Sequence, residues 1–206
     1  MPIAWIGLLI VALSLAVAAQ DNTAKAKISN APLTAEQIAV YRAVLKDYLR
    51  ESDGALNLAN VTEPLDHSRP MFDESCYATI KPGTTTTGEL MARHLDAAVT
   101  RNTRIVLVDP GRQQEAIEKN DPQNLVKRAV DDHEEVIDKQ VDDSVKRAFE
   151  TGLFTLSEIV FDKEHRHAVV SYSFVCGALC GNGDTLILEK IGHTWKVTKR
   201  CGGWVS

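Results

Sequence analysis

The C-terminal quarter of the chain carries a strand pattern that constrains the fold more than any other feature. Three β-rich runs, at 167–176, 184–190 and 194–200, are separated by short connections that contain glycine. Such short connections join antiparallel strands, whereas parallel strands need a long crossover. A fourth run, 154–161, precedes them and ends in a polar turn at 162–165. The sequence therefore predicts an antiparallel meander of four strands.

Alternation along these strands predicts which face of the meander is buried. Successive side chains on a strand point to opposite faces. The apolar positions that share a face on their own strands are Ala168, Val170, Tyr172, Phe174 and Cys176, then Leu186 and Leu188, then Trp195 and Val197. The polar positions predicted to lie opposite are Thr194, Lys196, Thr198 and Arg200. One side of the sheet is thus expected to be covered by other elements.

Helical signals dominate the part of the chain before the meander. Thr34 and Gln37 form a capping box before a helical pattern that runs to about Glu51. A second helix is expected from Asp121-Pro122 to Gly152, a run long enough for a break. Its apolar face comprises Val126, Val130, His133, Ile137, Val141, Val145 and Phe149.

The segments between these two helices give weaker signals. Residues 55–73 read as extended and irregular because they contain two prolines. Residues 89–99 suit a short helix, and 105–108 suit a buried strand that ends at Asp109-Pro110-Gly111.

Together these patterns predict an α+β fold. We expect one domain over residues 32–206, with a helical half at about 32–151 and an antiparallel sheet at about 153–206. In this arrangement, N-terminal amphipathic helices pack on one face of the C-terminal β-meander, in two layers.

The first residues are typical of a secretory signal peptide. Residues 1–19 form an apolar run without a charged side chain, and small residues at its end suit cleavage after Ala18 or Ala19. Residues 20–31 are polar and read as a flexible leader. We expect a secreted or periplasmic protein that contacts the membrane only through the signal segment, if that segment is kept as an anchor.

Export favours disulfide bonds among the four cysteines, Cys76, Cys176, Cys180 and Cys201. Cys176 ends the first strand of the three and Cys201 ends the third, which places them about 9 to 10 Å apart across the middle strand. A disulfide needs Cα atoms within about 7 Å, so a Cys176–Cys201 bond is disfavoured. Cys180 pairs with either of them, and Cys76 takes the remaining one.

Other chemistry for the cysteine region has less support. The spacing C-x3-C differs from the C-x2-C of thioredoxin-type sites, and it matches no standard zinc finger. The run from Cys176 to Gly183 is rich in glycine, but a strand follows it where a phosphate loop requires a helix. We interpret it as a tight β connection, pinned by a disulfide, whose glycines adopt positive φ. We predict no cofactor.

Histidine and acidic residues provide the alternative site. His165 and His167 flank Arg166 at a turn and point the same way if they lie on a strand, as two metal ligands would. His133 lies in an acidic helical region but does not form H-E-x-x-H. The acidic residues of that region are Asp131, Asp132, Glu134, Glu135, Asp138, Asp142 and Asp143. A solvated surface accounts for all of them, and a cation or a basic partner is the second interpretation.

The region from Leu156 to Val197 resembles the C-terminal part of small exported bacterial proteins of unknown function. The similarity is carried by CGALCGNG at 176–183 and by Trp195-Lys196-Val197, and it covers about a quarter of the chain. The resemblance implies a bacterial exported protein with a β-meander, and it transfers no catalytic residue.

Charge and motifs leave two classes of function. A net charge of -5 gives no surplus of positive charge for phosphates, which argues against nucleic acid as a partner. We expect a non-enzymatic binding or interaction module, stabilised by disulfides, with an unidentified ligand or protein partner. A small ligand or a peptide would be held between the helices and the sheet. The alternative is a secreted or periplasmic hydrolase, with or without a metal, whose site is assembled from dispersed residues such as His133, His165 and His167.

Overall fold

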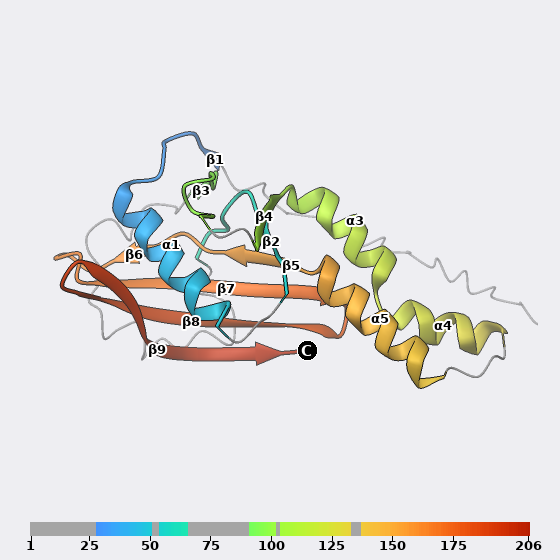
Figure 1. Ribbon diagram of the computed structural model, residues 1–206. Coiled ribbons are helices and arrows are strands. Elements are labelled where there is room, and N and C mark those ends of the chain that lie inside the picture. The colour runs from blue at the N-terminus through green and yellow to red at the C-terminus, as the bar shows by residue number, and fades with distance from the viewer. Residues whose placement is uncertain (1–27, 51–53, 66–90, 102–103, 133–136) are drawn as a thin grey trace, which may run out of the picture.

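The computed structural model describes residues 28–50, 54–65, 91–101, 104–132 and 137–206 (Figure 1). Within them, helices combine with a seven-stranded mixed sheet, so the predicted α+β class is confirmed. The predicted signal segment lies outside the described residues, as does most of the predicted leader. The last leader residues include strand β1 (Ile28–Ser29), which pairs in parallel with β3 (Ala92–Arg93).

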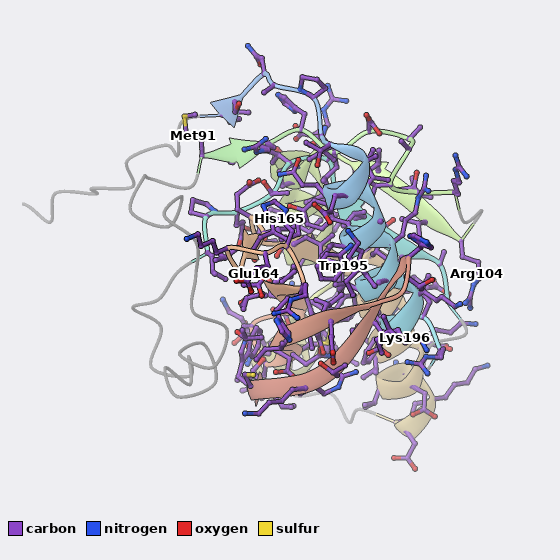
Figure 2. All side chains as sticks on the ribbon, turned by 90° about the vertical axis from the view of Figure 1, so that its left-hand side faces the viewer. Met91, Arg104, Glu164, His165, Trp195 and Lys196 are labelled. Carbon is purple, nitrogen blue, oxygen red and sulfur yellow. A yellow bond between two sulfur atoms is a disulfide. The ribbon has the colours of Figure 1, made fainter. Side chains whose placement is uncertain are left out.

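Helix α1 (Ala35–Tyr48) begins where the capping box predicts. The Thr34 side chain accepts a hydrogen bond from the Gln37 backbone N–H, and the Gln37 side chain accepts one from the Thr34 N–H. The buried face of α1 contributes Val40, Tyr41, Val44 and Leu45 to the main core. The helix packs across β9 (Thr194–Val205) (Figure 1). Trp195 lies between β9 and this helix (Figure 2).

The main sheet has the strand order β4-β2-β5-β7-β8-β9, and β6 (Val160–Phe161) pairs with β7. The part from β5 to β9 is antiparallel and contains β5 (Leu153–Leu156), β7 (His167–Gly177) and β8 (Cys180–Ile191). The predicted meander is therefore present, but two further strands extend the sheet in parallel. These are β2 (Leu56–Ala59) and β4 (Ile105–Val108).

The prediction of an irregular segment at 55–73 was wrong at its start. Leu56 and Leu58 of β2 both enter the main core, and β2 lies between β4 and β5. Parallel pairing buries this strand, so tertiary packing overrides the weak local signal of its four residues.

Two helix predictions in the middle of the chain also need correction. The described part of 89–99 forms β3 and a turn, in which the Asp96 side chain accepts a hydrogen bond from Ala98 N–H. A helix α3 (Pro110–Asn120) follows β4 and was not expected. Asp109 caps it and Pro110 occupies its first position, so the residues interpreted as the end of the strand in fact begin a helix.

The long helix expected up to Gly152 is divided into α4 (Gln123–Asp132) and α5 (Asp138–Thr151). Six apolar residues of the predicted face are exposed: Val126, Val130, Ile137, Val141, Val145 and Phe149. Helix α5 packs against α3 and β7, and its buried residues, Ser144 and Ala148, lie outside the predicted face. Phe149 of the predicted face is half-exposed and stacks on Phe174 of β7. Figure 1 shows α4 and α5 at the end of the molecule where β7 ends.

Apolar side chains cover both faces of the sheet. The predicted face of β7, β8 and β9 forms the main core with α1, and Leu186, Leu188 and Trp195 are buried there. A smaller cluster on the opposite face contains Val169, Ile187 and Cys201, so that face is less polar than predicted.

A β-bulge at Thr198 changes the face of the residues that follow it in β9. Val197 pairs with Leu188 while Lys199 pairs with Ile187, which leaves Thr198 as the extra residue. Arg200 consequently pairs with Leu186 and shares its face. The prediction that Arg200 lies on the polar face was therefore wrong.

Candidate functional site

A pocket of about 900 Å³ opens between the helices and the sheet. Its walls come from the end of α1, the segment 54–56, α5, and the adjoining ends of β7, β8 and β9. The larger side chains of its lining include Tyr48, Lys146, Phe149, Glu150, Tyr172, Phe174, Asn182, Asp184, Arg200 and Trp204. We call this space the helix–sheet pocket. Its volume is within the range of small-molecule sites in proteins.

Aromatic rings make up much of the apolar lining. Tyr172 contacts Tyr48 edge-to-face, with ring centroids 5.4 Å apart. Phe149 stacks on Phe174, with centroids 5.9 Å apart and ring planes 19° apart. Phe154, which is fully buried, stacks on Tyr172 with ring centroids 5.2 Å apart. Each of these rings contacts another ring, and all of them except the exposed Phe149 belong to the main core or pack against it.

Trp204 lines the pocket next to two glycines of β8. A Cβ atom on Gly181 would lie 3.1 Å from the indole ring and 2.8 Å from the Phe174 carbonyl oxygen. A Cβ atom on Gly183 would overlap the indole Nε1. Of the described glycines, only Gly192 and Gly202 have positive φ. The prediction that this loop uses glycine for positive φ was therefore wrong. Gly181 and Gly183 instead leave room for the indole ring of Trp204, which a side chain at either position would contact too closely.

Arg200 forms the polar end of the pocket together with two carboxylates. Its Nη2 donates to Asp47 Oδ2 at 2.8 Å, and its Nη1 lies 3.5 Å from Asp184 Oδ2 and 3.5 Å from the Tyr172 hydroxyl oxygen. Asp184 Oδ1 is buried and has no hydrogen-bond partner among the described residues. Asp47 also pairs with Arg50.

Tyr48 places a neutral phenol beside this polar end. Burial raises the pKa of Tyr48, and the nearby Tyr172 also raises it, while a hydrogen bond with Asn182 lowers it. The net shift is upward, so the hydroxyl group keeps its proton at ordinary pH.

The cysteines are structural in this arrangement. Cys176 and Cys180 are joined by a disulfide with a Cα–Cα distance of 5.0 Å. The bond spans the two-residue turn between β7 and β8, and it is one of the two pairings that the sequence left open for Cys180. Cys201 is also disulfide-bonded. Cys76 lies outside the described residues.

The β7–β8 turn is held from a second side by Asp121. Its carboxylate accepts a hydrogen bond from the Ala178 N–H at 2.8 Å, and a Cβ on Gly177 would lie 3.0 Å from it. The predicted helix start at Asp121 thus also anchors the disulfide-bonded turn.

The two candidate histidines of the turn have separate carboxylate partners. His165 Nδ1 lies 2.8 Å from Glu36 Oε2 of α1, and His167 Nδ1 lies 2.8 Å from Asp162 Oδ2. Asp162 also accepts hydrogen bonds from two backbone N–H groups of the turn, and these contacts hold its pKa below the ordinary value despite burial. Glu164 and His165 lie together at this turn (Figure 2).

The other predicted site residues are not brought to these histidines by the described part of the chain. His133, Glu134 and Glu135 lie outside it, while Asp142 and Asp143 are exposed on α5. In the ranges that the structure describes, no group of three or more His, Cys, Asp or Glu side chains could hold a metal ion.

Sequence reasoning missed a buried charge next to β5. Glu158 is 2% exposed, accepts a hydrogen bond from the Thr62 hydroxyl group and forms an ion pair with Arg93 at 3.0 Å. Burial raises the pKa of Glu158, and the Thr62 and Arg93 contacts only partly oppose that shift. The signal in the sequence was a lone glutamate inside the apolar run 153–161.

Comparison with family models, with curated proteins and with solved structures finds no match to this chain. Among the described residues, no helix is both long and apolar enough to span a membrane.

Proposed function

We propose that this chain is an exported, non-enzymatic binding module that holds a small organic ligand in the helix–sheet pocket. The N-terminal helices and one face of the sheet act as two layers that enclose the ligand. The apolar segment 1–19 and the disulfide-bonded cysteines support a secreted or periplasmic site of action. The resemblance to small exported bacterial proteins supports the same setting.

The observation that carries this proposal is the combination of volume and lining. The pocket has about 900 Å³ and an aromatic wall that ends in the Arg200–Asp184 pair. Sites of this size, mostly apolar with a few convergent polar groups, are the usual form of small-molecule binding sites.

Fluorescence of Nile red, a neutral apolar dye, tests whether the pocket binds. The mature protein should bind the dye, and Phe149→Ser should weaken binding about five-fold or more because it removes one ring of the wall. Phe149 is 54% exposed, so this variant should still fold.

Val126→Ser is the matched control for dye binding to exposed apolar surface. Val126 is 57% exposed on α4 and does not line the pocket. Dye affinity should therefore be unchanged in this variant. Weaker binding in Val126→Ser with no change in Phe149→Ser would place the dye on the helix surface and refute the proposal.

A further inference from the structure

Hydrogen-bonding capacity is left over at the polar end of the helix–sheet pocket. The two contacts of Arg200 Nη1, to Asp184 Oδ2 and to the Tyr172 hydroxyl, are both 3.5 Å, the outer limit of a hydrogen bond. The Asp184 carboxylate has a buried oxygen without a partner among the described residues. Buried polar groups are nearly always paired in folded proteins. Arg200 Nη1 and Asp184 Oδ2 therefore lie side by side as a donor and an acceptor, and their mutual contact is a long one of 3.5 Å.

The charges that line the pocket balance one another. The described lining residues include two cations, Lys146 and Arg200, and two anions, Glu150 and Asp184. Asp47, which holds Arg200 from α1, is also paired with Arg50. A charged ligand would lose hydration on entering the aromatic wall, and the four lining charges sum to zero and so offer it no net counter-charge. The balance favours an uncharged ligand.

Resting on the proposed function, we propose that the helix–sheet pocket recognises an uncharged primary carboxamide or lactam attached to an apolar or aromatic body. The ligand carbonyl oxygen accepts a hydrogen bond from Arg200 Nη1, and its N–H donates to the Asp184 carboxylate. Both groups must lie on one edge of the ligand. Primary amides and lactams have this edge, whereas an ordinary trans amide places its N–H and C=O on opposite sides. The body packs on the rings of Tyr172, Phe149 and Phe174.

Displacement of Nile red by four matched probes tests this assignment. The probes are 3-phenylpropanamide, its N-methyl derivative, 3-phenylpropanoate and 3-phenylpropan-1-amine. The primary amide should bind about ten-fold more tightly than each of the other three, because only it makes both hydrogen bonds without a buried net charge. Equal or tighter binding of either charged probe, or of the N-methyl amide, would overturn the assignment. A lactam, 2-piperidinone bearing a phenyl group, should match the primary amide if the shared edge is what is recognised.

Asp184→Asn tests the residue on which the assignment depends. The substitution keeps the size of the side chain but gives the pocket an excess positive charge, so 3-phenylpropanoate should become the tightest of the four probes. Asp142→Asn is the control, because Asp142 is an exposed carboxylate of α5 outside the pocket, and the primary amide should keep its advantage there. An unchanged preference in Asp184→Asn would overturn the assignment. Nile red binding without an amide preference refutes the ligand class alone, and absence of all binding refutes the proposed function too.

Discussion

Gly183→Ala tests the packing that places Trp204 at the pocket. The new methyl group would overlap the indole Nε1 and lie 2.7 Å from the Tyr172 carbonyl oxygen. Gly183 does not have a positive φ, so alanine adds no backbone strain of its own. The expected effect is therefore overpacking at the junction of β8 and β9.

The expected size of the effect follows from two opposing contributions. Overpacking a well-packed site costs about 1–3 kcal/mol. Replacing glycine by alanine recovers about 0.4–1 kcal/mol by restricting the unfolded chain. Gly183→Ala should therefore lower the free energy of unfolding by about 1–2 kcal/mol. Gly54→Ala is the control, because a Cβ there meets no atom within 4 Å and should leave stability unchanged or slightly higher.

Urea unfolding of the disulfide-bonded protein, followed by far-UV circular dichroism, measures this difference. The midpoint should fall while the slope stays constant, since the surface exposed on unfolding is the same. In a Trp204→Ala background the penalty of Gly183→Ala should shrink, because only the Tyr172 carbonyl contact remains. A stable Gly183→Ala variant, or an equal penalty in both backgrounds, would refute the reasoning.

Two further predictions concern the buried carboxylate and the cysteines. Burial raises the pKa of Glu158, so the free energy of unfolding of the wild type should fall as pH rises from about 4.5 through the folded-state pKa. Urea unfolding at several pH values should show that Glu158→Gln lacks this part of the pH dependence. An unchanged pH dependence in the variant would contradict the prediction. Non-reducing peptide mapping should give Cys176 linked to Cys180. It should also give the bonded Cys201 linked to Cys76, the cysteine that remains in the sequence, and an alkylatable thiol at Cys201 would contradict the pairing.

The sequence predicted the elements that are specified by residues close together in the chain. The hydrogen bonds between Thr34 and Gln37 join residues three positions apart, so the start of α1 could be predicted from the sequence. The buried face of β7 and β8 could be predicted from the alternation of apolar and polar residues, because residues such as Val170 and Leu186 face a continuous core.

Elements that depend on distant partners were missed or misplaced. Strand β2 exists because β4 and β5 pair with its two sides, and its four residues carry little pattern alone. The pocket was expected only as a space between helices and sheet. Its residues could not be named because Tyr48, Phe149 and Arg200 are far apart in the sequence and meet only after the sheet has formed.

The bulge at Thr198 decides what faces the pocket. A strand with regular alternation from Trp195 would turn Arg200 away from α1 and would turn Cys201 toward it. The extra residue reverses this, so Arg200 faces Asp47 and Asp184, and Cys201 joins the cluster on the opposite face of the sheet. The disulfide-bonded Cys201 therefore lies on the face of the sheet away from the helix–sheet pocket, and the guanidinium group of Arg200 forms the polar end of that pocket.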